Sequence, residues 1–436
     1  MANAAIIVEN SVGFVSQLLD VWAQGDCAVL IDERIPAVTA SSMMREANVS
    51  SCYFPARLLS KELIDHFAGI SLFSYSESCS KATILPQICY DKFVPKYSDT
   101  SAVVLYSSGT TGTSKGVVLS HYAINTNADA IIDYMNIGAE DCLYIVRSMS
   151  HSSVLIGELL VALKSKAKIL LAPLVVPPRY VFQNIQKYRV SLLCVNPSLL
   201  ALYATEYKGD ISLSSLKAIH TSGSILKNSI RNHANRCFTG IPIINSYGLT
   251  EAGPRVSSQA IGDCYGCSVG HPIAGVNIAI VNQNGEKAKT GEFGVIHVFT
   301  KSKYSGYLVG KVKHPSIYCD WLNTGDIGYL DENDELYIVG RIDNMLNLDS
   351  HKIYPESIEN IIIDLLSVDE CIVYLNENGT LVCDYIAQND IANEDLHLLH
   401  ERIQSHEIPK SFFHVASLPH TSTGKLLRKK SLDCFK

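Results

Sequence analysis

The clearest candidate for chemistry in this sequence is a loop rich in glycine and hydroxyl side chains. It runs from Tyr106 to Gly116 as Tyr-Ser-Ser-Gly-Thr-Thr-Gly-Thr-Ser-Lys-Gly, between the apolar runs 102–105 and 117–119. Each run has the character of a short buried strand, so we expect the loop at the tip of a strand-loop-strand unit. Its glycines let the backbone turn and expose N–H groups, while its hydroxyls and the ammonium of Lys115 supply further donors. Such a loop suits a polyphosphate.

Two other nucleotide-binding motifs are excluded by spacing. A P-loop needs Ser or Thr directly after its lysine to hold Mg²⁺, but Gly116 follows Lys115. A Rossmann fingerprint needs Gly-x-Gly-x-x-Gly, which the loop does not contain. A solvent-exposed hairpin tip of the same composition stays open as the alternative to a phosphate site.

The elements that must position this loop are typical of a layered α/β protein. A chain of 436 residues with 47% hydrophobic and 18% charged residues is a folded protein with room for two or three subdomains. Between residues 117 and 240, helix-like periodicity alternates with short apolar runs, which predicts α/β layers with largely parallel sheets. Between residues 268 and 340, frequent glycines and alternating apolar residues predict a small β-rich subdomain.

Charge, hydropathy and cysteine content argue against several classes of protein. The net charge of −7 gives no electrostatic footprint for nucleic acid, and the longest apolar runs are too short to span a membrane. The first residues lack the pattern of a signal peptide. The 13 scattered cysteines, an odd number, suit free thiols in a reducing compartment, so we expect a cytoplasmic protein. Cys264 and Cys267 form one C-x-x-C pair without a second pair, which favours structural thiols over a zinc site.

The loop and four later motifs resemble, in their order, the signatures of the adenylate-forming superfamily, which includes acyl-CoA and aryl-CoA synthetases, luciferases and adenylation domains. Tyr106 to Gly116 departs from the family's Y-T-S-G-T-T-G-x-P-K-G only at Ser107 and Ser114. Residues 247–251 match Y-G-x-T-E, and residues 324–326 match T-G-D.

Two further motifs bear on domain organisation. Residues 340–343 resemble the family's G-R-x-D hinge, and residues 418–428 match its L-P-x-T-x-x-G-K-x-x-R ending. The resemblance implies a large N-terminal AMP-binding domain of layered α/β sheets, 1–342, with a small β-rich subdomain. It also implies a small, mobile α+β C-terminal lid, 343–436, hinged at Asp343. The family's helix-glycine-strand segment lies at residues 18–32 here and well inside the chain in most relatives, so the N-terminus is expected to be shorter than usual.

The activity implied by the resemblance is ATP-dependent activation of a carboxylic acid to an acyl-adenylate, with release of pyrophosphate, followed by transfer to a thiol. ATP, Mg²⁺ and coenzyme A are the implied partners of such an acid-thiol ligase. Ser350 stands where CoA-using relatives have a glycine beside the pantetheine path, so a carrier-protein phosphopantetheine or an amine stays open as the acceptor. A non-catalytic nucleotide-binding relative would be expected to lack some of the motif residues, but all of them are present.

Roles carried over from the family fall on matching positions. Lys425 would bridge the carboxylate and the α-phosphate, Thr250 would bind the α-phosphate, and Glu251 would hold Mg²⁺. Asp326 would accept hydrogen bonds from the ribose hydroxyls, and Tyr247 would stack on adenine. The implied nucleotide-binding residues are Ser107, Ser108, Gly109, Thr110, Thr111, Gly112, Lys115, Gly223, Ser224, Asn245, Tyr247, Gly248, Asp326 and Arg341.

The acid-binding side is marked by His151, which matches the pocket histidine of the family. Relatives that activate amino acids carry an aspartate at this position to pair with the α-ammonium, because a buried cation without a counter-charge is costly. An α-amino acid is therefore disfavoured as substrate. Ser222, in the segment that resembles S-G-G-A, either narrows the acid pocket or gives it a polar wall. The sequence does not identify the acid.

Overall fold

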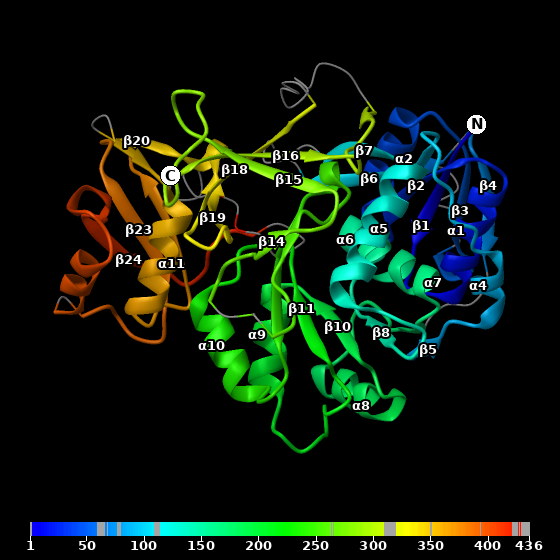
Figure 1. The fold of residues 1–436 in the computed structure, drawn as a ribbon, viewed down its shortest axis with the longest axis horizontal. Helices are drawn as coiled ribbons and strands as arrows, with labels where there is room; N and C mark the ends of the chain where they lie inside the picture. The colour runs from blue at the N-terminus through cyan, green and yellow to red at the C-terminus, as the bar shows by residue number, and fades with distance from the viewer. Residues whose placement is uncertain are drawn as a thin grey trace.

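The computed structural model describes residues 2–58, 66–67, 69–75, 80–108, 114–262, 264, 266–308, 320–348, 351–392, 394–420, 426 and 428. Two large sheets with helices around them take most of their strands from residues 3–272, and smaller sheets are formed mainly by the residues that follow (Figure 1). Among the described residues, no helix has the length and apolar character needed to cross a membrane.

The first large sheet has the strand order β17-β7-β6-β2-β1-β3-β4. Neighbours from β6 to β4 run parallel, while β7 and β17 are added antiparallel at one edge. Helix α1 (Val12–Ala23) leads into β2 through Gly25, whose φ of +82° suits glycine, so the predicted helix-glycine-strand unit is confirmed. The strands are β1 (Asn3–Val8), β2 (Cys27–Asp32), β3 (Val49–Pro55), β4 (Ser71–Tyr75), β6 (Ser101–Ser108), β7 (Ser114–Ser120) and β17 (Gly306–Tyr307).

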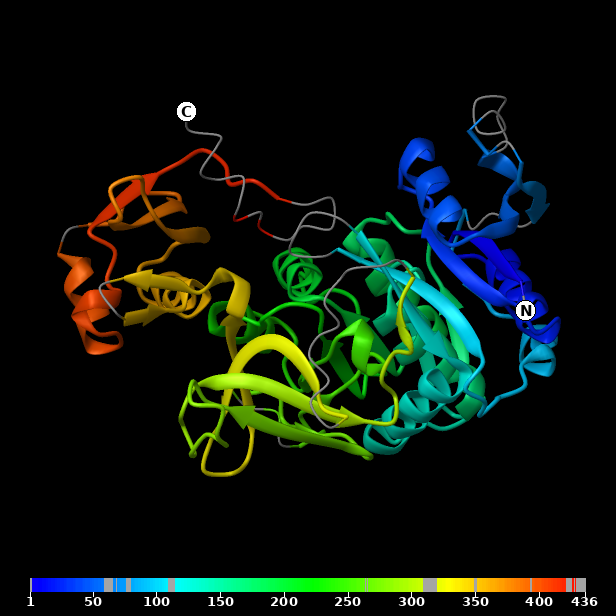
Figure 2. The ribbon, with the colours of Figure 1, turned by 90° about the horizontal axis from the view of Figure 1, so that it is seen from above.

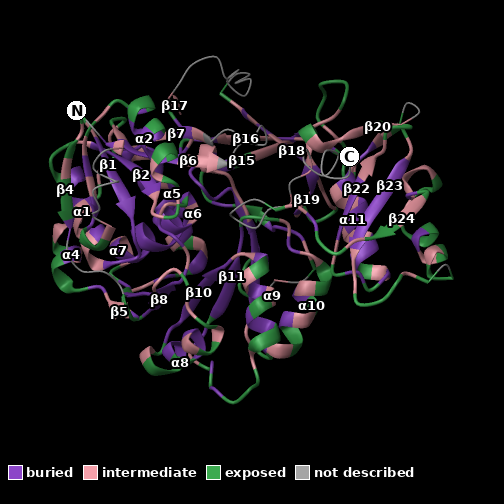
Figure 3. Cartoon of the chain, turned by 180° about the vertical axis from the view of Figure 1, so that it is seen from behind, coloured by how far each residue is buried: buried purple, intermediate pink, exposed green. Residues whose placement is uncertain are grey.

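The second large sheet has the strand order β14-β13-β12-β11-β10-β8-β9-β5. Its five central strands, β12 to β9, pair in parallel, as predicted. Strands β8 and β10 are buried along their whole length, as expected where both faces of a parallel sheet are covered (Figure 3). The strands are β5 (Thr83–Ile84), β8 (Cys142–Ile145), β9 (Lys168–Leu171), β10 (Leu192–Val195), β11 (Ala218–Thr221), β12 (Ile243–Tyr247), β13 (Ser257–Ser258) and β14 (His271–Pro272).

Helices connect and cover these sheets. A continuous helical segment begins directly after His151 and consists of α6 (Ser152–Val154), a π-helical stretch (Leu155–Leu160) and α7 (Val161–Ser165). π-Helical turns often occur at functional sites, because they displace side chains from the regular helical positions. The other main helices in this part are α2 (Ala37–Glu46), α4 (Gln87–Lys92), α5 (His121–Met135), α8 (Pro178–Tyr188), α9 (Pro197–Glu206) and α10 (Asn228–Cys237).

The predicted small β-rich subdomain is confirmed as a four-stranded antiparallel sheet of order β15-β16-β18-β19. Its strands alternate buried and less buried positions, most clearly in β16, which is the pattern of a sheet with one covered face. The strands are β15 (Val276–Val281), β16 (Gly294–Thr300), β18 (Leu322–Leu330) and β19 (Leu336–Arg341).

The C-terminal part has a hydrophobic cluster of its own, in which buried residues from Ile353 to Leu399 pack together. It lies to one side of the large sheets, and the chain reaches it after β19 and a 3₁₀ turn, Ile342–Asn344 (Figure 2). One contact back to the large part joins Asp364 of α11 to Asn228 and the backbone N–H of Ser229 in α10. The elements are β20 (Leu346–Leu348), β21 (His351–Ile353), α11 (Pro355–Leu365), β22 (Glu370–Leu375), β23 (Leu381–Ile386) and β24 (Ser411–His414).

Candidate active site

The ends of the predicted phosphate loop are held by a strand pair, so the expected strand-loop-strand unit is confirmed. Strands β6 and β7 pair antiparallel up to Ser107 opposite Lys115 and Ser108 opposite Ser114. Gly109, Thr110, Thr111, Gly112 and Thr113 lie outside the described residues, as do the side chains of Ser108 and Ser114. The strand pair therefore fixes where the loop begins and ends, and it aims Lys115 from the start of β7.

Lys115 is linked to the predicted magnesium ligand through a tyrosine. The ammonium of Lys115 lies 5.6 Å from the ring centroid of Tyr307, on the neighbouring strand β17. The hydroxyl of Tyr307 donates to Oε1 of Glu251 at 2.9 Å. Burial and the nearby carboxylate of Glu251 raise the pKa of Tyr307, so its hydroxyl stays protonated as a donor. Tyr307 thus contacts Lys115 through the face of its ring and Glu251 through its hydroxyl.

The predicted ribose site brings together residues that are far apart in the sequence. The hydroxyl of Tyr247, at the end of β12, donates to Oδ2 of Asp326 at 2.5 Å. Arg341, opposite Asp326 in the β18-β19 register, donates from Nη1 to Oδ1 at 2.8 Å. A carboxylate has about four acceptor positions, so each oxygen of Asp326 can still accept from a ribose hydroxyl. Burial, and after it the charge of Asp326, raises the pKa of Tyr247 well above its usual value, which keeps this hydroxyl a donor.

The Tyr-Gly-Leu-Thr-Glu segment packs closely against the chain that follows it. A Cβ on Gly248 would lie 1.7 Å from the carbonyl oxygen of Pro254, so only glycine fits there. The hydroxyl of Thr250 lies 2.9 Å from that of Ser152, the first residue of α6. His151 stands just before this helix and is exposed to solvent. The structure therefore places the predicted phosphate residue Thr250 beside the segment that carries His151.

The other predicted residues are spread over several elements of the fold. Gly223 and Ser224 follow β11 in an exposed turn, and Gly223 has a φ of +100°. Asn245 is buried, and its amide nitrogen donates to the carbonyls of Ser268 at 2.9 Å and Cys267 at 3.4 Å, so its carbonyl oxygen is the group left for a ligand. Asp343 lies in the 3₁₀ turn after β19. Lys425 and Ser350 lie outside the described residues.

The carboxylate of Glu251 suits a metal ion that is shared with a nucleotide. Over the described part of the chain, no group of three or more His, Cys, Asp or Glu side chains is arranged to hold a metal. Mg²⁺ in nucleotide sites takes one or two carboxylates and completes its shell with phosphate oxygens and water. The residues present therefore fit Mg²⁺ bound together with ATP. Cys264 and Cys267 are both free thiols.

A buried polar cluster lies behind the helical segment that follows His151. Arg147 pairs with Glu158 of the π-helical stretch at 2.8 Å; Glu158 is buried, and the Arg147 side chain is 10% exposed. Burial raises the pKa of Glu158 to about 7. Nη1 of Arg255 donates to the hydroxyl of Ser246 and lies 3.3 Å from Nδ1 of His220. Burial and the two arginines lower the pKa of His220 well below its usual value, so this imidazole is neutral.

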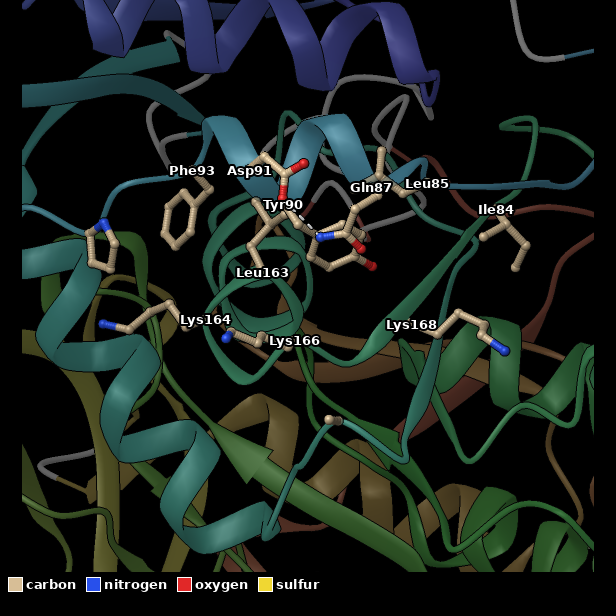
Figure 4. A pocket seen from close by; sticks show the side chains of 12 residues that line it. Ile84, Leu85, Gln87, Tyr90, Asp91, Phe93, Leu163, Lys164, Lys166 and Lys168 are labelled. Carbon is tan, nitrogen blue, oxygen red and sulfur yellow. Dashed lines mark hydrogen bonds between the residues drawn. The ribbon is translucent and has the colours of Figure 1, made fainter.

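A hollow of about 630 Å³ lies elsewhere, beside α4 and α7 (Figure 4). Its walls include Tyr90 and Asp91 on one side and Lys164, Lys166 and Lys168 on the other. None of the predicted site residues lines it, so its size does not mark the nucleotide site.

Two residues of interest were missed from the sequence. Tyr307 follows a glycine in an otherwise ordinary stretch, and only strand pairing brings it to Glu251. Arg255 carried a weak signal, since it is a single charged residue between Ala252-Gly253-Pro254 and Val256, directly after the Tyr-Gly-Leu-Thr-Glu motif. Charged residues are rarely fully buried unless they are paired, so a charge in such a stretch indicates a specific partner.

Comparison with known proteins identifies the family. The family model described as "AMP-binding enzyme" matches residues 2–308. The chain is 28% identical over 351 residues to a 2-succinylbenzoate–CoA ligase of Bacillus licheniformis, covering 76% of this chain and 70% of the relative. It is 28% identical over 362 residues to 4-coumarate–CoA ligase 3 of Arabidopsis thaliana, covering 76% of this chain but only 62% of that relative.

Solved structures support the fold. ATP-bound MatB from Rhodopseudomonas palustris superposes with a TM-score of 0.87 at 20% identity, covering 100% of this chain and 89% of MatB. O-succinylbenzoate coenzyme A synthetase from Bacillus subtilis, in complex with ATP and magnesium, gives 0.83 at 20% identity, covering 99% and 89%. The chain therefore belongs to the AMP-binding enzyme family, which confirms the predicted adenylate-forming superfamily, the α/β fold class and the assignment to the AMP-forming acid-thiol ligases.

Proposed function

We propose that this enzyme activates a carboxylic acid with ATP and Mg²⁺ and transfers the acyl group to the thiol of coenzyme A. The observation that carries the proposal is the meeting of Tyr247, Asp326 and Arg341, from three different strands, in one hydrogen-bonded group. This group offers an aromatic face, a carboxylate with free acceptor positions and a guanidinium, which suit adenine, ribose and phosphate in turn.

In the first half-reaction, a carboxylate oxygen of the acid attacks the α-phosphorus of ATP, and pyrophosphate leaves. The main obstacle is repulsion between anions, which fixed donors and positive groups lower. Lys115 and the loop before it would bind the β- and γ-phosphates, Thr250 the α-phosphate, and Glu251 a Mg²⁺ that neutralises phosphate charge. Lys425 would stabilise the developing charge at the reacting phosphorus.

In the second half-reaction, the thiol attacks the acyl carbonyl, and AMP leaves as the thioester forms. We propose that residues 343–436 act as a lid that rotates about Asp343, withdrawing Lys425 and admitting the thiol. The separate hydrophobic cluster of the C-terminal part and the short turn at Ile342–Asn344 support this hinge.

The acceptor is proposed as coenzyme A because the relatives reported above are named as CoA ligases. A carrier-protein phosphopantetheine or an amine acceptor predicts a different time course. Pyrophosphate release should then stop after a single burst that coenzyme A does not relieve. Multiple turnover that depends on coenzyme A, with an acyl-CoA product, would support the proposal. The assay is pyrophosphate release with Mg-ATP and a panel of aryl and alkyl acids, run without and then with coenzyme A.

Lys425→Ala provides the direct test of the first half-reaction. We expect acid-dependent pyrophosphate release to fall at least about 100-fold, equivalent to about 3 kcal/mol, because a donor to the transition state is lost. ATP binding, measured by calorimetry, should persist. Lys410→Ala, at an exposed position of the same part of the chain, is the matched control. Normal pyrophosphate release by the Lys425 variant would exclude the proposed role.

A further inference from the structure

Arg255 is a buried cation that has no carboxylate partner among the described residues. Its exposed fraction is 3%, and no carboxylate oxygen of the described residues lies within ion-pair distance of its guanidinium. Hydrogen bonds to described residues come only from Nη1, toward Ser246 and His220. Nε and Nη2 make no hydrogen bond with a described residue. Two donors of a buried cation are therefore left for an acceptor that the described residues do not supply.

The backbone of Arg255 is fixed, so the position of the guanidinium is built into the fold. The side chain of Asn127, on α5, accepts from the backbone N–H of Arg255 at 3.0 Å and donates to its carbonyl at 2.9 Å. Asn127 is itself buried. Because the amide oxygen and the amide nitrogen of Asn127 both bond to Arg255, they hold its backbone in one position.

The local charge does not balance. Arg147 pairs with Glu158 at 2.8 Å, the charge of Arg255 also acts on this carboxylate, and His220 is neutral. Two arginines therefore share one carboxylate, and Arg255 has no ion-pair partner of its own among the described residues. Burying a charge in this way is costly unless a counter-charge arrives from elsewhere, as a bound ligand can supply.

The guanidinium lies on the acid side of the site. Ser246 and Tyr247 are neighbours on β12 and face opposite ways, so Arg255, on the side of Ser246, is separated from the Tyr247–Asp326 contact. A Cβ placed on Gly157 would lie 3.5 Å from Nη2 of Arg255 and 3.8 Å from Ile131. Gly157 belongs to the helical segment that begins after His151. Nη2 of Arg255 thus lies beside the segment where the acid is expected.

We propose that Arg255 binds a second anionic group at the far end of the acid, so that the preferred substrates are dicarboxylic acids. This inference rests on the proposed function, since it names the class of acid that the same site activates. The bound carboxylate would supply the ion-pair partner that the described residues do not provide, and would accept from Nε and Nη2. One carboxylate reacts with ATP while the other is held by Arg255, which acts as a specificity residue.

The test compares matched acids in the pyrophosphate assay: adipate against hexanoate, and terephthalate against benzoate. We expect the native enzyme to favour the dicarboxylate of a pair by about 100-fold in kcat/KM, because a desolvated charge pair is formed only with that acid. Arg255→Met should abolish this preference while largely keeping activity on the monocarboxylate. Arg255→Lys, which keeps the charge, should retain part of the preference. Thermal-shift titration with adipate should show stabilisation of the native protein that Arg255→Met loses.

The matched control is Arg231→Met, because Arg231 is also buried but donates to Gln259 and the carbonyl of Cys264 outside the proposed site. It should lose stability without changing the ratio between acids. Should Arg255→Met not fold, Gly157→Ala replaces it, since its methyl makes ordinary contact with Nη2 and should lower the dicarboxylate preference about tenfold.

The possible outcomes distinguish a failure of the dicarboxylate preference from a failure of the proposed ligase function. A native enzyme that activates monocarboxylates as well as or better than dicarboxylates would overturn the inference and leave the ligase function standing. The same holds for a preference that survives both Arg255→Met and Gly157→Ala. Failure of every acid to release pyrophosphate would overturn the proposed function and the inference together.

Discussion

Two arginines at the site, Arg341 on the nucleotide side and Arg255 on the acid side, differ in how the protein compensates their charge. Arg341 pairs with Asp326 at 2.8 Å, and its side chain is 36% exposed. Arg255 is almost wholly buried and contacts a serine and a neutral histidine. The same type of side chain thus has an ion-pair partner in one place and none among the described residues in the other.

This difference indicates what each side is built to bind. A neutralised arginine beside a carboxylate suits the uncharged hydroxyls of a sugar, because the carboxylate supplies acceptors and the arginine keeps it oriented. A buried arginine without a counter-charge suits an anion, because the ligand completes the ion pair. The comparison makes separate predictions for the two sides.

The largest effect is expected for Asp326→Ala on the nucleotide side. It removes the proposed ribose acceptors and leaves Arg341 and the Tyr247 hydroxyl without their shared partner. We expect kcat/KM for ATP to fall roughly 100-fold, or about 3 kcal/mol, because hydrogen bonds to a charged group are lost. Steady-state kinetics at varied ATP, with adipate and with hexanoate, measures the effect. Asp326→Asn, which keeps an acceptor, should lose less. A loss confined to one acid would contradict the separation of the two sides.

A smaller effect is expected for Tyr307→Phe, which tests whether the nucleotide side depends on a positioning residue. Removing the hydroxyl frees Glu251 from its 2.9 Å hydrogen bond. The Mg²⁺ concentration for half-maximal pyrophosphate release should rise about tenfold, since a hydrogen bond to a charged group contributes on the order of 1.5 kcal/mol. Tyr304→Phe is the control, because it keeps the ring that packs on Tyr307 with centroids 5.0 Å apart and leaves the hydrogen bond between Tyr307 and Glu251 in place. An unchanged Mg²⁺ dependence in Tyr307→Phe would remove Tyr307 from the site.

A third effect, on stability and not on activity, is expected for Glu158→Gln. Burial raises the pKa of Glu158 to about 7 from its usual 4.5. Between these pH values the folded state holds a proton that the unfolded chain has released, so the unfolding free energy falls as pH rises. The slope is at most about 1.4 kcal/mol per pH unit. Urea denaturation between pH 5 and 8 should show a flatter profile for Glu158→Gln than for the exposed control Glu286→Gln. Identical profiles would show that Glu158 titrates normally.

Much of the nucleotide side was predictable from sequence because its residues occur in short, ordered motifs. Tyr247 to Glu251 and Asp326 are adjacent to glycines that the backbone requires, as the contact of Gly248 with Pro254 illustrates. The layered α/β fold was predictable for a related reason. Short apolar runs such as 192–195 can be satisfied only as strands buried on both faces, and the structure confirms this. The roles assigned to individual residues, Lys425 above all, stay predictions.

The sequence by itself determined the family, the strand-loop-strand unit and the order of the nucleotide motifs, because these depend on local conformation and on residues close together in the chain. Only the tertiary structure decided the partners of Tyr307 and Arg255. Tyr307 reaches Glu251 because β17 joins the edge of β7, and Arg255 contacts His220 and Ser246 because β11 and β12 lie side by side. Whether a buried charge is compensated depends on residues that are distant in the sequence but close in space. A local sequence pattern therefore cannot predict it.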